Sequence, residues 1–378
     1  MSENRLLFID NVRLLVIIMV VMQHLAVTYS GFGSWYYVEP AELGIVQTII
    51  FGFYQAFSQG FFMGLLFLIA GYFIPDTYNK KGFGNFLKDR FIRLGIPTLI
   101  YMLIIHPLLA FAILGYRYDD YDGWVTFGRY LSHFDFIGNS GPLWFAFALL
   151  IFTVIYAILR KLSKDKEVIG NGSFPAFPKI LFFIVLMGLI SYLVRIVQPV
   201  GTSVINMQLC HFTQYVMMFF IGIKARCHDW LNKLTYKTGK TWFVWGLILG
   251  FVIFAVMMIL GGALDGNLGL FDGLGTWQSF AYALWESFVA VAMAIGLLAL
   301  FREKFNKQNS LIKAMSVNTF AVYVFHSVIV VLLTMFFSPV RLLPIFKFLI
   351  MVFTAVPLCF IIVNFTIQKI PFLRKIFS

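Results

Sequence analysis

The chain has 378 residues, of which 60% are hydrophobic and only 12% are charged. A soluble domain has roughly 25% charged residues, so this composition excludes an ordinary soluble protein and indicates an integral membrane protein. The formal net charge is +12, but lysines and arginines collect in short loops between apolar stretches. There they set topology and meet anionic lipid, so we expect membrane lipids, and no nucleic acid, as the partners of this charge.

Ten apolar stretches follow one another along the chain, each close to the length of about 20 residues that a helix needs to cross a membrane. The sequence therefore predicts an all-α, polytopic membrane helix bundle of about ten transmembrane helices, in one domain covering residues 1–378. No small-residue cleavage site follows the first stretch, so we expect it to be retained. The stretches are 14–29, 45–74, 94–115, 142–158, 180–197, 207–223, 242–261, 277–301, 311–337 and 342–366.

Glycines interrupt the second stretch at Gly52, Gly60, Gly64 and Gly71. These residues predict a kink or a break in the helix, and their spacing is typical of close helix packing in membranes. The segment that follows, 83–93, is basic and amphipathic, so we expect it to lie along the cytoplasmic surface.

Basic residues sort to one side of the predicted bundle when alternate loops are assigned to alternate sides. One set comprises the N-terminus, 75–93, 159–179, 224–241, 302–313 and the C-terminal tail, and holds 23 of the 29 lysines and arginines. The opposite set holds Arg117, Arg129, Arg195, Arg341 and Lys347, beside eight acidic residues: Glu39, Glu42, Asp119, Asp120, Asp122, Asp135, Asp265 and Asp272. This bias predicts that the first set, with both termini, is cytoplasmic.

An arginine and a histidine, Arg13 and His24, share one face of the first predicted helix. They are eleven residues apart, which is about three turns and roughly 16 Å of helix. Asp10 lies three residues before Arg13 and within reach of it. A helix face with an arginine at one end and a histidine at the other suits a long ligand with an anionic end and a reactive end. The alternative is that Arg13 is a snorkelling anchor and His24 a hydrogen bonder between helices.

Several segments carry a family resemblance. "FIDNVRLLVIIMVVMQHLAVTYSG" resembles the first helix of the integral-membrane acyltransferase family 3, whose signature is Arg, ten residues, then His. "FFMGLLFLIAGYF" with "FLKDRFIRLGIP", then "GPLWFAFALLIF", "NTFAVYVFHSVIVV" and the tail "KIPFLRKIFS" resemble later parts of the family in the right order. The tail and the "ES" of "LWESF" are similar to the branch that succinylates periplasmic glucans.

The resemblance implies a multi-pass enzyme of the inner membrane. It would move an acetyl or succinyl group from cytoplasmic acyl-CoA to a hydroxyl of an extracytoplasmic or membrane-facing glycan. His24 matches the essential histidine of the family, as general base or as transient acyl carrier. Arg13 matches the essential arginine, which would hold a CoA phosphate or orient the donor. Arg90 and Arg93 match a basic pair suited to the CoA phosphates.

Further positions complete the candidate site. Glu286 is a carboxylate inside a predicted span, and we expect it to act in catalysis or to pair with a His or an Arg. His326 is either part of the pocket or a structural hydrogen bonder. We expect His106 and Arg195 to be helix-end features, and His211 to lie near the outer face, where it could touch a sugar. The expected pocket residues are Asp10, Tyr72, Trp144, Tyr323 and His326.

Other classes of function fit the sequence less well. No His-x-x-x-His or paired-Cys spacing is present, so we expect no metal, and the three cysteines are expected to be free thiols. A proton-coupled transporter or lipid-linked sugar permease is the main alternative, because Arg13, His24 and Glu286 lie within predicted spans. The absence of an internal repeat counts against it. A structural membrane protein is the third interpretation.

Overall fold

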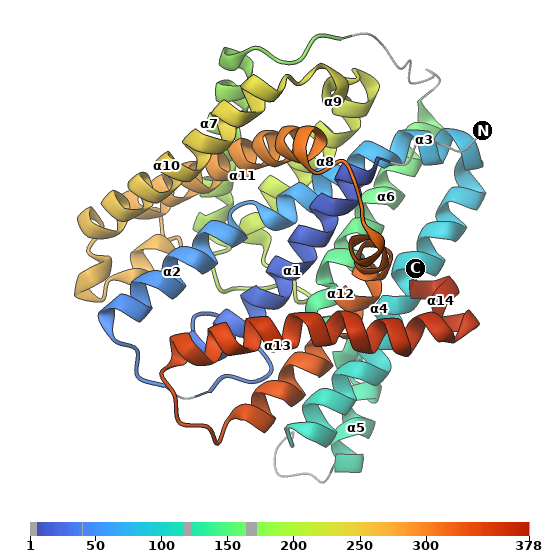
Figure 1. The fold of residues 1–378 in the computed structure, drawn as a ribbon, viewed down its shortest axis with the longest axis vertical. Helices are drawn as coiled ribbons and strands as arrows, with labels where there is room; N and C mark the ends of the chain where they lie inside the picture. Colours follow the sequence, from blue (N-terminus) through green and yellow to red (C-terminus); the bar gives the residue numbers. More distant parts are fainter. Residues whose placement is uncertain (1–5, 40, 117–122, 164–171, 378) are drawn as a thin grey trace.

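The computed structural model describes residues 6–39, 41–116, 123–163 and 172–377 (Figure 1). Within these ranges the chain forms helices and connecting loops, with a single isolated β-bridge between Val204 and Met207. Four residues of the predicted outer set, Arg117, Asp119, Asp120 and Asp122, lie outside the described ranges.

Eight helical stretches of the described chain are long and apolar enough to cross a membrane, which confirms the all-α membrane bundle. Seven contain one helix each. They are α1 (Leu7–Ser30), α6 (Trp144–Leu162), α7 (Phe177–Val197), α10 (Tyr236–Leu260), α11 (Trp277–Lys304), α12 (Ser310–Phe337) and α13 (Pro344–Phe365).

The remaining stretch, Ile45–Ile113, accounts for part of the difference from ten predicted spans, because it contains two of them. It comprises α2 (Ile45–Gln59), α3 (Phe62–Arg90), α4 (Ile96–Ile100) and three π-helical segments, Phe91–Gly95, Tyr101–Ile105 and Leu108–Ile113. The other difference is α8 (Phe212–Cys227), which matches the sixth predicted stretch but has only 16 residues. Short helices complete the fold: α5 (Gly123–Ser132), α9 (Trp230–Lys233) and α14 (Pro371–Phe377).

The predicted break in the second span lies between α2 and α3, at Gly60. Gln214 of α8 compensates for it, because its Nε2 donates to the Gly60 carbonyl at 2.6 Å. Gln59, the last residue of α2, donates in turn to the Tyr215 hydroxyl at 3.0 Å. A broken helix is tolerated at membrane depth only where neighbouring groups satisfy the freed backbone, and α8 supplies these groups.

The helices α3 and α8 pack with their backbones almost touching, as the glycine spacing predicted. A Cβ atom added at Gly71 would lie 2.1 Å from the Phe219 carbonyl oxygen, and one added at Gly222 would lie 2.0 Å from the Leu68 carbonyl oxygen. No side chain fits at either position. This contact fixes α8 against α3 beside the break.

Substitution at this contact should therefore destabilise the bundle. We expect Gly71→Ala to lower the free energy of unfolding by about 1–3 kcal/mol or more, because a backbone carbonyl cannot move aside as a side chain can. Thermal unfolding of the purified protein in detergent measures the effect. Gly52→Ala is the matched control, since nothing lies within 4 Å of its Cβ position. Equal stability of the two variants would contradict the packing.

The first helix, α1, runs through the middle of the bundle, with α12 and α13 beside it (Figure 1). Its first turns are bonded to the connection between α11 and α12: Asn11 Nδ2 donates to the carbonyls of Phe305 at 2.6 Å and Lys307 at 3.1 Å. In the same predicted set of loops, Lys233 Nζ donates to the Gly172 carbonyl at 2.7 Å. Loops assigned to one side thus contact one another.

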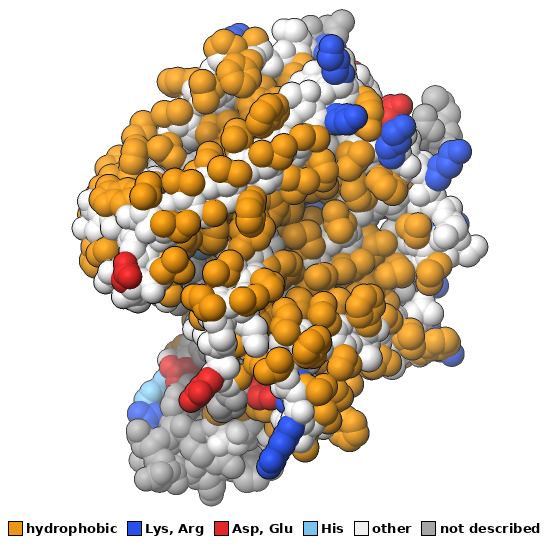
Figure 2. All heavy atoms as spheres, turned by 60° about the vertical axis from the view of Figure 1, so that its left-hand side comes forward, with side chains coloured by type: hydrophobic (Ala, Val, Ile, Leu, Met, Phe, Trp, Pro, Cys, Tyr) orange, Lys and Arg blue, Asp and Glu red, His pale blue; other side chains and the backbone are white. Residues whose placement is uncertain are grey.

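Loops of the opposite set also contact one another. The Val200 amide donates to the Asp272 carbonyl at 2.7 Å, and the Tyr116 hydroxyl donates to the Tyr36 carbonyl at 2.6 Å. Between the two sets, the surface visible in Figure 2 is covered largely by hydrophobic side chains, as a lipid-facing surface requires. The loops therefore occupy two sides of the bundle, and the assignment of one side to the cytoplasm stays a prediction from the charge bias.

Candidate active site

His24 lies near the end of α1, in contact with two other aromatic rings. The indole of Trp35 stacks on it, with ring centroids 3.7 Å apart and planes 15° apart. The imidazole of His326, on α12, lies 5.2 Å from His24 and 6.1 Å from Trp35, centroid to centroid. His326 is fully buried. The structure thus brings together two histidines that are about 300 residues apart in sequence.

Residues 31–39, which we call the strap, follow α1 and carry Trp35 onto His24. The strap is held at its far end by Glu39. The Glu39 amide donates to the Thr28 carbonyl at 2.9 Å, and the Glu39 carboxylate forms an ion pair with Lys347 of α13. Lys347 is only 2% exposed. A buried ion pair of this kind fixes a geometry, because its lysine would be costly to leave unpaired.

Tyr36 holds the middle of the strap. Its hydroxyl lies 2.7 Å from His106 Nδ1 and 3.1 Å from the Tyr101 hydroxyl, which also reaches Ser327 Oγ at 2.9 Å. Burial, with a smaller contribution from Tyr101, raises the pKa of Tyr36 well above its ordinary value. The phenol therefore stays protonated. His106 thus anchors the strap through Tyr36.

Basic side chains gather around Arg13, toward the other end of α1. Arg13 Nη1 lies 3.5 Å from Asp10 Oδ1, which confirms the predicted pairing, and its guanidinium lies over the Phe73 ring at 5.0 Å. Arg13 and Arg93 are close enough to repel the Arg90 guanidinium. Arg90 Nε is buried and has no hydrogen-bond partner among the described residues. Three arginines thus concentrate positive charge at this end.

We call Arg13, Arg90 and Arg93 the arginine cluster. Two acidic side chains reduce its net positive charge. One is Asp10. The other is Asp89, which lies 3.4 Å from Arg93 Nε and 3.0 Å from Lys81 Nζ. Positive charge remains in excess, which favours an anionic ligand.

The predicted pocket residues are divided between the two ends of α1. Tyr323 lies beside His326, with centroids 6.2 Å apart, and its hydroxyl donates to the Pro142 carbonyl. Tyr72 lies under the Arg226 guanidinium, at 5.9 Å, on the side of the arginine cluster. Trp144 stacks on Tyr215, with ring centroids 5.4 Å apart.

Glu286 is buried against two cationic partners. Its carboxylate forms an ion pair with Arg195 of α7 and lies 2.8 Å from His211 Nδ1. Arg195 has no exposed surface, and its guanidinium lies over the Tyr282 ring at 5.0 Å. Arg195 lies in the last turn of α7, as expected, but both Arg195 and His211 are buried against Glu286 instead of facing outward. Both are drawn inward because a carboxylate in an apolar bundle must be paired. The predicted pairing of Glu286 with a His or an Arg is confirmed, and its catalytic role stays a prediction.

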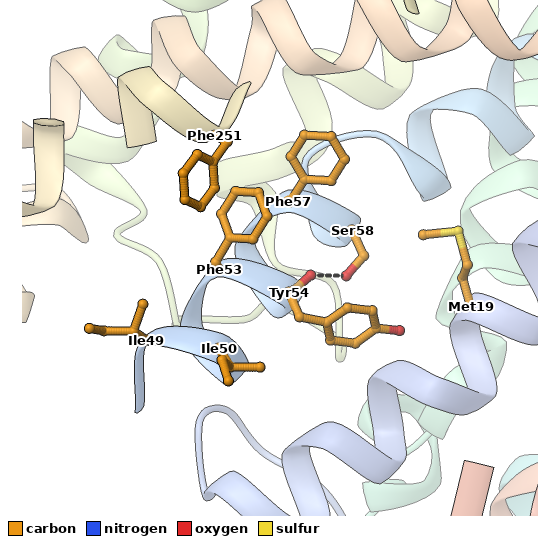
Figure 3. Close-up of a pocket in the computed structure, with 8 residues that line it drawn as sticks. All are labelled: Met19, Ile49, Ile50, Phe53, Tyr54, Phe57, Ser58 and Phe251. Carbon is orange, nitrogen blue, oxygen red and sulfur yellow. Dashed lines mark hydrogen bonds between the residues drawn. The ribbon is translucent and has the colours of Figure 1, made fainter. Parts of the chain in front are cut away.

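A cavity of about 270 Å³ lies between α1, α2 and α10 (Figure 3). In the close-up, the Ser58 hydroxyl donates to the Tyr54 carbonyl. Gln23 Oε1 lies 2.9 Å from the same hydroxyl and is an alternative acceptor for its proton. Gln23 precedes His24, so the cavity lies on a neighbouring face of α1. Its walls are otherwise apolar, which suits hydrocarbon better than acyl transfer. The lining residues are Met19, Ile49, Ile50, Phe53, Tyr54, Phe57, Ser58 and Phe251.

Metal ligands and thiols give little additional chemistry. Among the described residues no three His, Cys, Asp or Glu side chains gather as they would around a metal ion. Cys210, Cys227 and Cys359 are free thiols, as predicted.

The bundle and its covered histidine pair define a multi-pass membrane protein with a site able to move protons or carry a group. The chain belongs to the acyltransferase 3 family, whose model, described as an acyltransferase domain, matches residues 6–364. The family resemblance of the sequence motifs is therefore confirmed.

Similar curated proteins are named glucans biosynthesis protein C. They come from Salmonella typhi, Salmonella typhimurium and Salmonella heidelberg. Each is 25% identical over 262 residues, which represent 65% of this chain and 65% of the relative. The chain thus matches slightly less than two thirds of the length of these relatives. No solved structure matches it.

Proposed function

We propose that the protein is an O-acyltransferase of the inner membrane that moves an acetyl or succinyl group from cytoplasmic acyl-CoA to a glycan hydroxyl. The observation that carries this proposal is the arrangement on α1, with the arginine cluster toward one end and the covered His24 toward the other. The two sites are about 16 Å apart along the helix. CoA is a long donor with phosphates at one end and a thioester at the other, so it matches this spacing.

The orientation of the donor follows from the charge bias. The arginine cluster belongs to the side with most lysines and arginines, which the positive-inside rule assigns to the cytoplasm, where acyl-CoA is found. Two of the five basic residues on the opposite side, Arg195 and Lys347, are buried in ion pairs with Glu286 and Glu39. That side therefore has fewer basic residues outside ion pairs than its sequence count of five suggests.

The roles of the site residues follow from this orientation. Arg90 and Arg93 would bind CoA phosphates as charge-assisted hydrogen-bond donors, and Arg13 would direct the donor along α1. His24 would then meet the thioester, as general base or as acyl carrier. Tyr323 and His326 line the same end, whereas Tyr72 lies closer to the donor phosphates. Asp10 would orient Arg13.

The acceptor would approach from the side of the strap. The relatives carry the word glucans in their names, which supports a glucan as the acceptor here. The strap also presents Trp35 over His24. Aromatic rings are amphipathic platforms with an apolar face, and such a face suits the apolar surface of a sugar ring.

Removal of one phosphate-binding arginine should weaken donor binding. We expect Arg90→Ala to raise the KM for acetyl-CoA or succinyl-CoA about 10–100-fold with a smaller change in kcat, since a charged hydrogen bond contributes about 1.5–3 kcal/mol. Steady-state release of CoA thiol measures both constants. Arg374→Ala, which removes an exposed arginine from the same side, is the control. A lower kcat at unchanged KM would contradict the assignment.

Two measurements test the proposed function. Mass spectrometry of envelope glycans should show acetyl or succinyl esters in cells that contain the protein and their loss in cells that lack it. The purified protein should also consume acyl-CoA when a glucose oligosaccharide is supplied. Transport of an unmodified sugar without thioester consumption would overturn the proposal in favour of a transporter.

A further inference from the structure

The hydrogen bonding of His326 shows which of its two ring nitrogens carries the proton of the neutral imidazole. Its Nδ1 lies 2.8 Å from the carbonyl oxygen of Tyr323, one turn earlier on α12. A carbonyl oxygen only accepts hydrogen bonds, so Nδ1 must be the donor and must carry the ring proton. In the neutral ring the other nitrogen, Nε2, then holds a free lone pair. This atom is the only basic atom of the side chain.

The free nitrogen of His326 is buried without a partner. Nε2 has no hydrogen-bond partner among the described residues, and the whole residue has no exposed surface. A buried acceptor left unbonded costs about 1–3 kcal/mol. A phenylalanine or leucine would fill the space without this cost, so the observed arrangement points to a ligand that bonds to Nε2.

The position of His326 relative to His24 bears on the identity of this ligand. Trp35 covers one face of the His24 ring at 3.7 Å. The centroids of Trp35 and His326 are 6.1 Å apart, too close for the three rings to form a straight stack. His326 therefore lies beside His24, with planes 21° apart. The two imidazoles are therefore neighbours, with ring centroids 5.2 Å apart, so that a group on His24 and a ligand of His326 would share one site.

The titratable groups around this pair are few. Tyr323 lies on the same helix, Tyr101 reaches α12 through Ser327, and Tyr36 comes from the strap. Among the carboxylates, Glu286 is engaged by Arg195 and His211. The imidazoles are therefore the bases available to an acceptor hydroxyl here.

We propose that His24 carries the acyl group while Nε2 of His326 accepts the proton of the acceptor hydroxyl. This division of roles rests on the proposed function and extends it to a second catalytic residue. In the first step a ring nitrogen of His24 attacks the thioester carbonyl, so that an N–C bond forms, the C–S bond breaks and CoA thiolate leaves. In the second step the acceptor oxygen attacks the same carbonyl, an O–C bond forms and the N–C bond breaks. The thiolate takes a proton from water as it leaves, and the hydroxyl proton passes to His326 Nε2 and then to water, which leaves both rings neutral.

The variant His326→Asn separates these two steps. The asparagine amide can still donate to the Tyr323 carbonyl, but it has no basic nitrogen. With the full chain in lipid nanodiscs and radiolabelled acetyl-CoA or succinyl-CoA, we expect this variant to release about one equivalent of CoA thiol and to retain label on the protein. Its steady-state transfer to a glucose oligosaccharide should fall about 100-fold or more. His24→Ala should show neither release nor label.

The outcomes are distinguishable. Wild-type transfer rates in folded His326→Asn would overturn the role of His326 but not the proposed function. Loss of the first step as well would make His326 a structural residue. Absence of CoA release from the wild-type protein would instead overturn the proposed function.

A second measurement tests the proton position without any activity. In ¹⁵N-histidine-labelled protein, the spectrum of the wild type minus that of His326→Asn isolates one of six histidines. We expect a protonated Nδ1 and an unprotonated Nε2, the less common tautomer. The reverse pattern would overturn the proposal, because Nε2 would then have no lone pair to offer.

Discussion

The variant His24→Ala is expected to lose acyl transfer by about 10²–10⁴-fold, the range that a positioned acid–base or nucleophilic side chain contributes. The reason is structural, because α1 brings only this side chain between the strap and α12, with Trp35 at 3.7 Å and His326 at 5.2 Å. Arg13 and the arginine cluster lie about 16 Å away along the helix and cannot substitute for it. Transfer of label from acyl-CoA to a glucose oligosaccharide measures the loss.

His133→Ala is the matched control for this result, since it removes an exposed histidine from the same side of the bundle. We expect it to leave kcat and KM unchanged. Thermal unfolding of both variants shows whether the bundle stays folded. Undiminished transfer in a folded His24→Ala protein would remove His24 from the mechanism.

The pairing of Arg195 with Glu286 is expected to produce the largest effect on stability. Breaking a buried ion pair by removing one partner costs about 3–5 kcal/mol, because the other charge stays buried alone. Glu286→Leu should be worse than Arg195→Met. The first leaves Arg195 and His211 without a counter-charge, whereas the second leaves Glu286 still able to pair with His211, which lies 2.8 Å away.

The double variant Arg195→Met/Glu286→Leu completes a cycle and gives the interaction directly. We expect it to be more stable than Glu286→Leu alone, because it no longer buries the Arg195 charge without its carboxylate partner. Unfolding midpoints of the four proteins in one detergent provide the comparison. The same double variant tests the predicted catalytic role of Glu286. A protein that folds and transfers normally would limit this residue to the ion pair, and one that folds but transfers slowly would support catalysis.

Local features of the site could be predicted from the sequence. The eleven-residue spacing of Arg13 and His24 and the neighbouring Asp10 follow from helix geometry alone. The break at Gly60 follows from the clustering of glycines. The count of spans differs because α8 is only 16 residues long and because Ile45–Ile113 is one continuous stretch, in which π-helical turns replace an ordinary boundary. Pro97 and Pro107, which lack an amide proton, lie within this stretch.

The contacts between distant residues could not be predicted in the same way. Trp35 belongs to an aromatic run that is typical of a membrane interface, and nothing in its periodicity indicates that it stacks on His24. Arg195 and His211 carried a weak signal, because a lone carboxylate such as Glu286 in an apolar span needs a cationic partner. The sequence does not say which of several candidates supplies it, since that depends on how α7 and α11 pack together.

Because the strap covers His24, it bears on how much acyl donor the cell would consume. Trp35 lies on one face of His24, and Tyr36 and Glu39, which follow it, tie the strap to the bundle. In the absence of a sugar, water can reach an acyl group on His24 only past these rings. An uncovered acyl-imidazole would react with water and waste one thioester at each turn. Under the proposed mechanism the strap would keep the protein loaded between encounters with its acceptor, so that consumption of the donor would follow the supply of glycan.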